Sequence, residues 1–338
     1  MNTQLLTPPL VSVIIPVYNI GEVVAQMLDS ILVQTEQSFE VICINDGSTD
    51  NGKTLSVLEA YAHKDSRIHV ITRTNAGPGA TRDYGLSLAR APFCYVCDQD
   101  DILHPQLFEY CLWALQQYDA EFIAFRWAAF TSNNLPKIER LPENFKQIPI
   151  LIADEKTRQN APAQYVKAHE IHVDHWCHFS TTTLARQYSF SQSIVRPWAI
   201  IQMSSRWLVS EATLYFYNVN QVGSMSRSKI SEKTIQRFHE QYSILYELYA
   251  KERIDGDPVG LWAFINQHVA MVLKQIYNRI RRSKDLGKTI RTRQYQALTN
   301  MLYDFFFIKE FSFRAVRIQH KLAYLWLILR FKVLARHK

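Results

Sequence analysis

Strand-like and helix-like segments alternate through the first 130 residues, and this alternation constrains the fold more than any other feature of the chain. The predicted strands are short, apolar and rich in β-branched residues, and polar or turn-forming residues follow them. They cover residues 11–17, 39–44, 67–71, 93–97 and 121–127. Amphipathic helices are predicted between them, over residues 22–34, 54–63, 79–89 and 105–118. This alternation predicts an α/β fold with a mainly parallel sheet and helices on both faces.

The rest of the chain divides into two further regions. The length of 338 residues allows about two domains. Residues 131–228 show weaker patterns, and we expect them to complete the domain that begins with residues 1–130. Residues 229–338 show apolar positions at helical spacing and no strand alternation, which predicts an amphipathic helical C-terminal region. The expected organisation is therefore a domain over 1–228 followed by a helical extension.

Charge is distributed unevenly along the chain. Residues 271–338 carry 16 Lys and Arg against three acidic residues, a net charge of +13, whereas residues 1–270 carry 22 against 28, a net charge of −6. Basic and aromatic residues mixed at helical spacing suit a helix on an anionic membrane surface. The alternative is a helical subdomain whose Lys and Arg side chains are only solvated. No nucleic-acid-binding motif is present, so nucleic acid is not an expected partner.

The cysteines and apolar segments predict the cellular location. The five cysteines form no even framework, and Cys94 and Cys97 would lie on opposite faces of one strand. We therefore expect reduced, buried thiols in a cytoplasmic protein. The first nine residues lack a signal-peptide pattern, and no apolar run approaches the roughly 18 residues of a transmembrane helix. Together with the basic region, residues 271–338, these features predict a peripheral protein at the inner face of the cell membrane.

An acidic cluster, Asp98-Gln99-Asp100-Asp101, follows the fourth predicted strand. Asp98 and Asp100 are candidate ligands of one Mg²⁺ or Mn²⁺ ion, because these hard cations prefer carboxylate and diphosphate oxygens. An isolated D-x-D is more often a solvated acidic turn. The other strand ends of the chain therefore decide between the two interpretations.

Three further polar loops follow or adjoin the predicted strands, at residues 16–19, 45–50 and 75–82. Ligands of open α/β sheets bind beyond the carboxyl ends of the strands. Asp46 can accept a hydrogen bond from a base or ribose, and Arg82 can neutralise phosphate. Each loop alone could be an ordinary turn or helix cap. Four such loops in one order indicate a site for a nucleoside diphosphate.

At this point the sequence resembles the inverting glycosyltransferases of family 2, which have the GT-A fold. The resemblance is carried by residues 13–19, 44–50, 75–77 and 81–85, and by the 98–101 cluster with Pro105. It implies a GT-A fold and a nucleotide-sugar donor, most often UDP-linked, with Mn²⁺ or Mg²⁺ as cofactor. It also implies inversion at the sugar and a saccharide or lipid-linked glycan acceptor. Bacterial surface polysaccharide or lipopolysaccharide synthesis would suit both this acceptor and the basic region.

The resemblance implies roles for individual residues. The implied nucleotide-sugar ligands are Pro16, Tyr18, Asn19, Asp46, Asn75, Gly77, Arg82, Asp98 and Gln99. The implied metal ligands are Asp98 and Asp100, and Asp101 beside them is a candidate catalytic residue. The donor half of the site is therefore well marked.

Residues 1–130 are expected to form the nucleotide-binding half of the domain and residues 131–228 the acceptor half. The acceptor half lacks the general base that is usual in this family. That base belongs to a Glu-Asp pair, yet residues 190–207 contain no acidic residue, and Pro197-Trp198 stand about where the pair is expected. Candidate substitutes are Asp174, His175 and His178. A carboxylate beside a histidine can raise the basicity of the imidazole, although the same residues could form a structural cluster or, less often, a zinc site. Two other hypotheses stay open: a non-catalytic protein that binds sugar nucleotides, and a transferase of another donor, such as a CDP-linked group.

Overall fold

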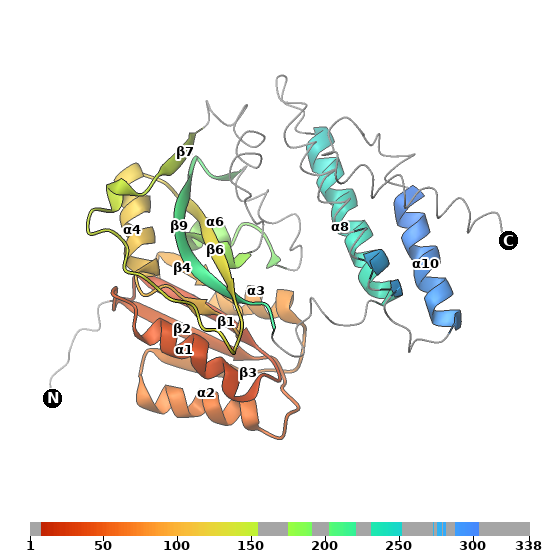
Figure 1. Cartoon of the computed structure of the whole chain (residues 1–338), viewed down its shortest axis with the longest axis horizontal. Helices are drawn as coiled ribbons and strands as arrows, with labels where there is room; N and C mark the ends of the chain where they lie inside the picture. The colour runs from red at the N-terminus through yellow and green to blue at the C-terminus, as the bar shows by residue number, and fades with distance from the viewer. Residues whose placement is uncertain are drawn as a thin grey trace. The chain divides into compact units, whose positions relative to one another are not determined.

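The computed structural model describes residues 8–154, 175–190, 203–220, 231–251, 273, 276–278, 280–281 and 288–303. The chain divides into two compact units (Figure 1). One unit comprises Met1–Lys156 and Ile171–Val222, and the other comprises Thr157–Glu170 and Gly223–Lys338. The domain boundary expected near residue 228 stays a prediction, because residues 221–230 lie outside the described part of the chain.

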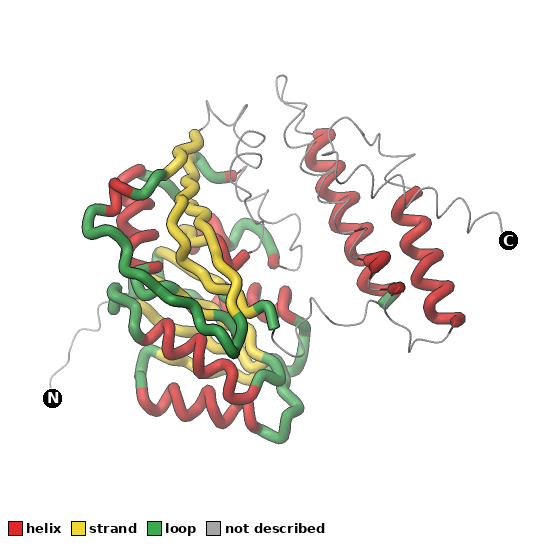
Figure 2. The backbone as a smooth tube through the Cα atoms, viewed as in Figure 1, coloured by secondary structure: helices red, strands yellow, loops and turns green. Residues whose placement is uncertain are grey.

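Strands and helices alternate through the first part of unit one (Figure 2). Its strands are β1 (Val11–Val17), β2 (Phe39–Asn45), β3 (Ile68–Thr72), β4 (Phe93–Val96), β5 (Ile102–Leu103), β6 (Phe122–Phe130), β7 (Ile150–Asp154), β8 (His178–Thr181) and β9 (Arg206–Asn218). Its helices are α1 (Val24–Leu32), α2 (Lys53–Lys64), α3 (Pro78–Leu88), α4 (Leu107–Tyr118) and α6 (Thr182–Ala185), with 3-10 turns η1 (Gly21–Val23), η2 (Phe145–Gln147) and η3 (His175–Cys177). The second unit contains α8 (Glu232–Lys251) and α10 (Lys288–Tyr303), which contact each other. The segments predicted over the first 130 residues are confirmed, with ends that differ by at most three residues.

The sheet is mixed, with strand order β3-β2-β1-β4-β8-β6-β9-β5 and β7 paired to β9. The four strands β1 to β4 are parallel, and β6 is parallel to β9. Between them β8 runs antiparallel to both β4 and β6. The start of β8 therefore lies at the same edge of the sheet as the carboxyl end of β4.

Helices cover both faces of the sheet, as the sequence predicted. On one face, alternate residues of β1 join α1, α2 and α4 in a single apolar core. On the other face, Ile14 packs with Leu86 of α3 and Ala185 of α6. The α3 helix lies very close to β1, because a Cβ atom at Gly85 would come within 2.5 Å of Ile14 Cγ2.

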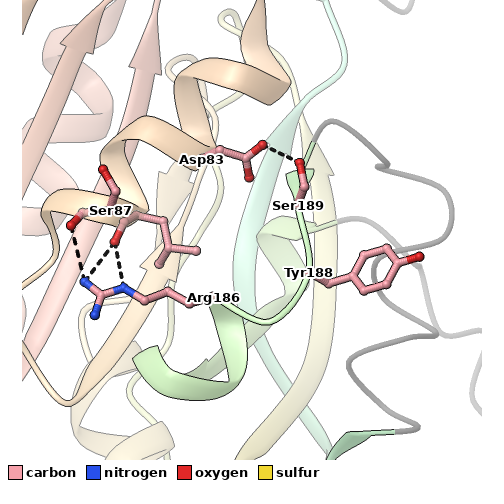
Figure 3. A pocket seen from close by; sticks show the side chains of 6 residues that line it. Asp83, Ser87, Arg186, Tyr188 and Ser189 are labelled. Carbon is pink, nitrogen blue, oxygen red and sulfur yellow. Dashed lines mark hydrogen bonds between the residues drawn. The ribbon is translucent and has the colours of Figure 1, made fainter.

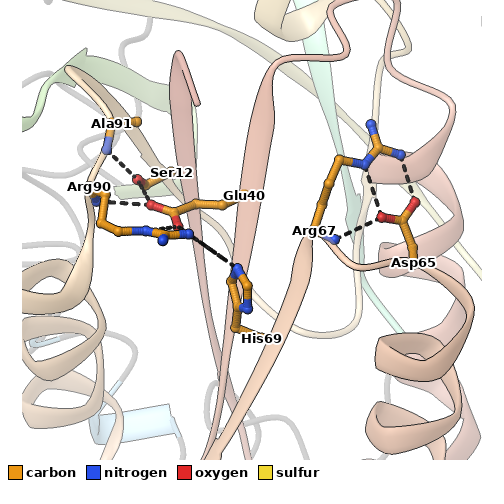
Figure 4. A network of polar contacts seen from close by, with 7 residues as sticks. All are labelled: Ser12, Glu40, Asp65, Arg67, His69, Arg90 and Ala91. Atoms are coloured by element: carbon orange, nitrogen blue, oxygen red, sulfur yellow. Dashed lines mark hydrogen bonds and ion pairs between the residues drawn. The ribbon is translucent and has the colours of Figure 1, made fainter. Parts of the chain in front are cut away.

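Glu40 organises the edge of the sheet opposite the polar loops (Figure 4). It is 3% exposed and accepts hydrogen bonds from Ser12 Oγ at 2.6 Å and from Arg90 N and Nε at 2.9 and 2.8 Å. Burial alone would raise its pKa, but the bonds from Ser12 and Arg90 together hold the pKa of Glu40 below its usual value. A buried, satisfied carboxylate here ties β1 and β2 to the chain that follows α3.

All five cysteines lie in the described part of the chain as buried thiols without a disulfide. Burial raises the pKa of Cys43 to about 12, so this thiol stays protonated. Cys94 and Cys97 belong to the cores on opposite faces of the sheet, which confirms the prediction for this pair. Among the described residues, no helix combines the length and apolar character required to span a membrane.

Candidate active site

The first and second loops are joined by the side chain of Asn19. Its Oδ1 accepts the N–H of Thr49 at 2.7 Å, and its Nδ2 donates to Thr49 Oγ1 at 3.1 Å. The backbone N–H of Asn19 donates to Ser48 Oγ at 3.0 Å. Asn19 has a φ of 46°, in the left-handed region that Asn tolerates better than most residues. These contacts fix the loop that follows β1 relative to the loop that follows β2.

Asp46 joins the second loop to the third. Its buried carboxylate accepts the N–H groups of Ala76 at 3.0 Å and Gly77 at 2.9 Å, and Asn75 Nδ2 donates to its carbonyl at 2.8 Å. Gly77 has a φ of 84°, which costs glycine little, and Pro78 opens α3. Asp46 and Asn75 therefore shape the loop that was predicted to meet the nucleotide.

Gln99 joins the acidic turn to the first loop. Its Oε1 accepts the N–H of Tyr18 at 2.7 Å, and its Nε2 donates to the Tyr18 carbonyl at 3.3 Å. The Tyr18 side chain is 43% exposed, whereas Pro16 is buried in β1 opposite Ile44. The four loops predicted as a site thus form one hydrogen-bonded unit at the carboxyl edge of β1 to β4.

Asp98 is the meeting point of α3, η3 and the acidic turn. Its Oδ1 accepts a hydrogen bond from Arg82 Nη2 at 2.6 Å and lies 3.1 Å from His175 Nε2. Burial acts to raise the pKa of Asp98, but His175 and Arg82 together hold it well below its usual range. The Arg82 Nε–H is buried and has no hydrogen-bond acceptor among the described residues. Two residues predicted for separate roles, phosphate binding and proton transfer, are therefore both partners of Asp98.

Asp100 and Asp101 have pKa values displaced in the opposite direction. Burial and the charge on Asp98 raise the pKa of Asp100 to about 7, and burial with the charges of Asp98 and Asp100 raises that of Asp101 to about 8. Asp101 is fully buried and accepts hydrogen bonds from the Tyr215 hydroxyl and, at 2.7 Å, from the Asn218 N–H. Asp101 thus fastens the acidic turn to β9.

Tyr215 and Trp176 contribute to the site but were not predicted to do so. The Trp176 ring stacks on Tyr215 at 4.7 Å and on Tyr217 at 5.4 Å between centroids. Its carbonyl accepts the Tyr95 hydroxyl at 2.6 Å. These contacts fix the chain next to His175. The only sequence signal was the run of aromatic residues at the end of β9.

The candidate bases are separated in the structure. His175 lies at the acidic turn, whereas His178 is in β8, where its ring is buried against Phe122 with centroids 4.8 Å apart. Asp174 lies outside the described residues, as does most of the 190–207 segment where the family's acid pair is expected. Within the described ranges, no three His, Cys, Asp or Glu side chains are grouped to hold a metal ion.

Comparison with solved structures defines the class of protein. The crystal structure of S. aureus TarS 1-349 in complex with UDP-GlcNAc superimposes with a TM-score of 0.59 and 18% sequence identity, covering 87% of this chain and 80% of that chain. This chain therefore has the GT-A fold of the glycosyltransferases. A family model described as glycosyl transferase family 2 matches residues 12–185, just over half of the chain. The chain belongs to that family.

Curated glycosyltransferases match about a third of the chain. Glycosyltransferase GlyG of Streptococcus pneumoniae is 33% identical over 115 residues, which are 34% of this chain and 38% of the relative. The poly(ribitol-phosphate) beta-glucosyltransferase of Bacillus spizizenii is 36% identical over 97 residues, 28% of this chain and 15% of the relative. The matches therefore span well under half of the length of these relatives.

Proposed function

We propose that the protein transfers a sugar from a UDP-linked donor, with inversion, to a saccharide or lipid-linked glycan in bacterial surface polysaccharide or lipopolysaccharide synthesis. The observation that carries the proposal is the hydrogen-bonded set of four loops that ends at Asp98, between Arg82 and His175. Membership of family 2 supports the reaction class. The similarity to a poly(ribitol-phosphate) glucosyltransferase supports the setting, and the complex of TarS with UDP-GlcNAc makes UDP the first nucleotide to test.

In this proposal the first three loops bind the nucleotide. The exposed ring of Tyr18 offers a face on which a base can stack. The carboxylate of Asp46 keeps further lone pairs for a ribose hydroxyl while it holds Gly77 in place. Arg82 brings a positive charge to the diphosphate, for which its fork of donors is suited. The backbone around Gly77 can approach the ligand closely because no side chain intervenes.

Asp98 and Asp100 fit a Mg²⁺ or Mn²⁺ ion. Both contacts of Asp98 with described side chains use Oδ1, which leaves Oδ2 for a cation. Burial and the charge of Asp98 raise the pKa of Asp100, and a cation beside the two carboxylates would favour the ionised form of both. Two carboxylates completed by diphosphate oxygens and water match the usual environment of Mg²⁺. The bound cation would stabilise the charge of the departing diphosphate.

Of the predicted bases, His175 has the position that suits the role. Its ring lies against Asp98, with Nε2 3.1 Å from Oδ1, and in this proposal the imidazole takes the proton of the acceptor hydroxyl. A carboxylate partner raises the basicity of an imidazole. His178 is buried in the sheet, and the Asp101 carboxylate accepts hydrogen bonds from the Tyr215 hydroxyl and the Asn218 N–H. Asp174 stays a candidate from the sequence.

The test measures UDP release from UDP-glucose and UDP-N-acetylglucosamine with Mn²⁺, and in parallel the affinity for UDP. The wild-type protein is expected to bind UDP in a metal-dependent way and to release UDP slowly by hydrolysis. Asp100→Ala should lose both activities, whereas Asp65→Ala, which removes a carboxylate paired with Arg67 beside β3, should keep both. UDP binding without release, unchanged in Asp100→Ala, would favour the non-catalytic alternative. Release only from a CDP-linked donor would favour the third hypothesis.

A further inference from the structure

We propose that Asp83 is a positioning residue that sets the orientation of His175 and, through it, of Asp98. The inference rests on the proposed function for the role of Asp98 in donor binding. It extends that function to a residue to which neither the loops nor the family resemblance assigned a role. Asp83 follows Arg82 on α3, and its carboxylate bonds to the segment that follows α6.

Asp83 anchors the segment that follows α6 (Figure 3). Its Oδ2 accepts the Ser189 hydroxyl at 2.5 Å, and its Oδ1 accepts the N–H of Phe190 at 2.6 Å. One carboxylate therefore holds two consecutive residues, and hydrogen bonds to a charged acceptor are the stronger kind. Figure 3 shows Asp83 pointing toward Ser189, while Tyr188 points away from them both.

The same segment is fastened to α3 at its other end by Arg186. Its guanidinium donates to the carbonyls of Leu86 at 3.1 Å and Ala89 at 2.6 Å, at the C-terminus of α3. The last carbonyls of a helix need such partners, so Arg186 caps α3 and fixes the start of the segment at once. Residues 186–190 are thereby held along α3 at two points.

Phe190 connects this anchored segment to His175. Phe190 is 3% exposed and belongs to the core between the sheet and α3, so its ring has little room to move. It meets the His175 ring edge to face, with centroids 6.0 Å apart and planes at 89°. Aromatic rings prefer this arrangement, which restricts the rotation of the imidazole. Nε2 of the same imidazole lies 3.1 Å from Asp98 Oδ1.

Two sets of contacts, which we call the two arms, lead from neighbouring residues of α3 to Asp98. Arg82 contacts Asp98 directly, and Asp83 reaches the same carboxylate through Phe190 and His175. Neighbouring residues of a helix point about 100° apart, so Arg82 and Asp83 of α3 can take part in different contacts. The helix therefore fixes Asp98 from two sides, and loss of either arm should loosen the donor site.

The first experiment compares Asp83→Ala, Asp83→Asn and Ser87→Ala in the full chain, by calorimetric titration with UDP and Mn²⁺. Asp83→Ala is expected to raise the Kd for UDP about fivefold. Asn can accept from the Phe190 N–H and donate to the Ser189 hydroxyl, so Asp83→Asn should stay within about twofold of wild type. Ser87 lies one turn along α3, and its hydroxyl donates to the Tyr84 carbonyl, so Ser87→Ala should bind UDP normally. An unchanged Kd in a folded Asp83→Ala would overturn the proposal.

A double-mutant cycle separates positioning from a merely structural role. If Asp83 acts through His175, Asp83→Ala should cause no further loss of UDP affinity in a His175→Ala background. The same loss in both backgrounds would refute the pathway. Should Asp83→Ala fail to fold, Phe190→Leu removes the aromatic contact while keeping apolar bulk, and the same cycle applies.

A second readout does not depend on nucleotide binding, so failure of the proposed function would leave this test intact. The ring protons of His175 should show a ring-current shift from Phe190 in the NMR spectrum of the ligand-free protein, assigned by comparison with His175→Ala. That shift should disappear in Asp83→Ala and persist in Asp83→Asn and Ser87→Ala. An unaltered His175 resonance in Asp83→Ala would contradict the inference even if UDP binding fell.

Discussion

Asp98 and Asp100 are two residues apart, yet their environments displace their pKa values in opposite directions. Asp98 is paired with Arg82 and His175, which favour its ionised form. Asp100 is opposed by burial and by the charge of Asp98, which raise its pKa to about 7. Such opposed displacements are common in functional sites, because chemistry there requires charges that folding alone would not favour.

Replacement of Asp98 should affect both stability and binding. Arg82 is 8% exposed, so Asp98→Ala leaves a buried guanidinium without its anion and should lower the free energy of unfolding by about 3 kcal/mol. The same change should abolish Mn²⁺-dependent UDP binding. Adding Arg82→Met removes the buried charge and should recover part of the stability but none of the binding. Urea unfolding and calorimetry measure the two effects, and normal UDP affinity in Asp98→Ala would rule out the proposed donor site.

His104 should make stability depend on pH. It is 2% exposed, its Nδ1 accepts the N–H of Gln106 at 3.0 Å, and its Nε2 lies 2.8 Å from the Glu139 carbonyl. Burial lowers the pKa of His104 below 6.5. The unfolded chain therefore binds the proton first, so stability that is complete above about pH 6.5 is lost as pH falls toward the folded pKa.

The control variant for this pH dependence is His104→Asn, because its amide oxygen can replace Nδ1 as the acceptor of the Gln106 N–H. Urea midpoints at about pH 7.5 and pH 5.5, on either side of the ordinary histidine pKa, should fall further in wild type than in the variant. Equal falls would assign the pH dependence to other groups.

At the scale of elements, α2 begins just after the second loop of the candidate site and α3 begins within the third. The Asp50 carboxylate accepts the N–H of Thr54 at 3.0 Å near the start of α2. Thr54 Oγ1 in turn accepts the N–H groups of Ile20 and Gly21 at 3.0 and 2.9 Å, which ties the first loop to this helix. The α3 helix begins at the third loop and is held by Asp83 and Arg186 further along. Hydrogen bonds at the ends of helices, the ordinary alternative to a binding role for each loop, here stabilise the loops of the candidate site.

Gly85→Ala should destabilise the protein by about 2 kcal/mol, because the new methyl group would overlap Ile14 in the core. In an open position the same change in a helix would be favourable by about 1 kcal/mol. Ser87→Ala on the exposed side of α3 is the matched control and should change stability by less than about 0.5 kcal/mol. Urea unfolding decides the matter, and a gain in stability for Gly85→Ala would show that α3 is free to move away from β1.

At the scale of the whole molecule, net charge differs between the body of the chain, residues 1–270, and the basic region, residues 271–338. Residues 271–338 carry a net charge of +13, while α8 and α10 are the helices described in the second unit. We expect this basic region to bring the protein to anionic lipid, where a lipid-linked acceptor of the proposed reaction would reside. Each basic residue near such a surface contributes about 1 kcal/mol, so a few suffice for measurable binding.

The full chain should therefore sediment with vesicles of about 30% phosphatidylserine, not with neutral vesicles, and should dissociate at about 0.5 M salt. Replacing Lys321, Arg330 and Lys332 by Gln should weaken binding. The matched control replaces three lysines of the body, Lys53, Lys64 and Lys137. Equal effects of the two triple variants would indicate non-specific attraction, and no binding by wild type would favour a basic region that is only solvated.

The sequence by itself predicted the parallel strands β1 to β4 and the four loops that follow or adjoin them. Apolar β-branched runs, turn residues and helix caps act within a few residues, so β1 to β4 and their loops could be predicted from local patterns. Between residues 131 and 180 the strands β7 and β8 are short, and no periodic pattern revealed them.

Only the tertiary structure decided which residues complete the acidic turn. His175 meets Asp98 across 77 residues because β8 runs antiparallel beside β4, and Tyr215 meets Asp101 across 114 residues because β9 joins the same sheet. Pairings at such separations depend on strand order and direction, which leave no local pattern in the chain. The partners that set the charge and position of the carboxylates were therefore visible only in the folded protein.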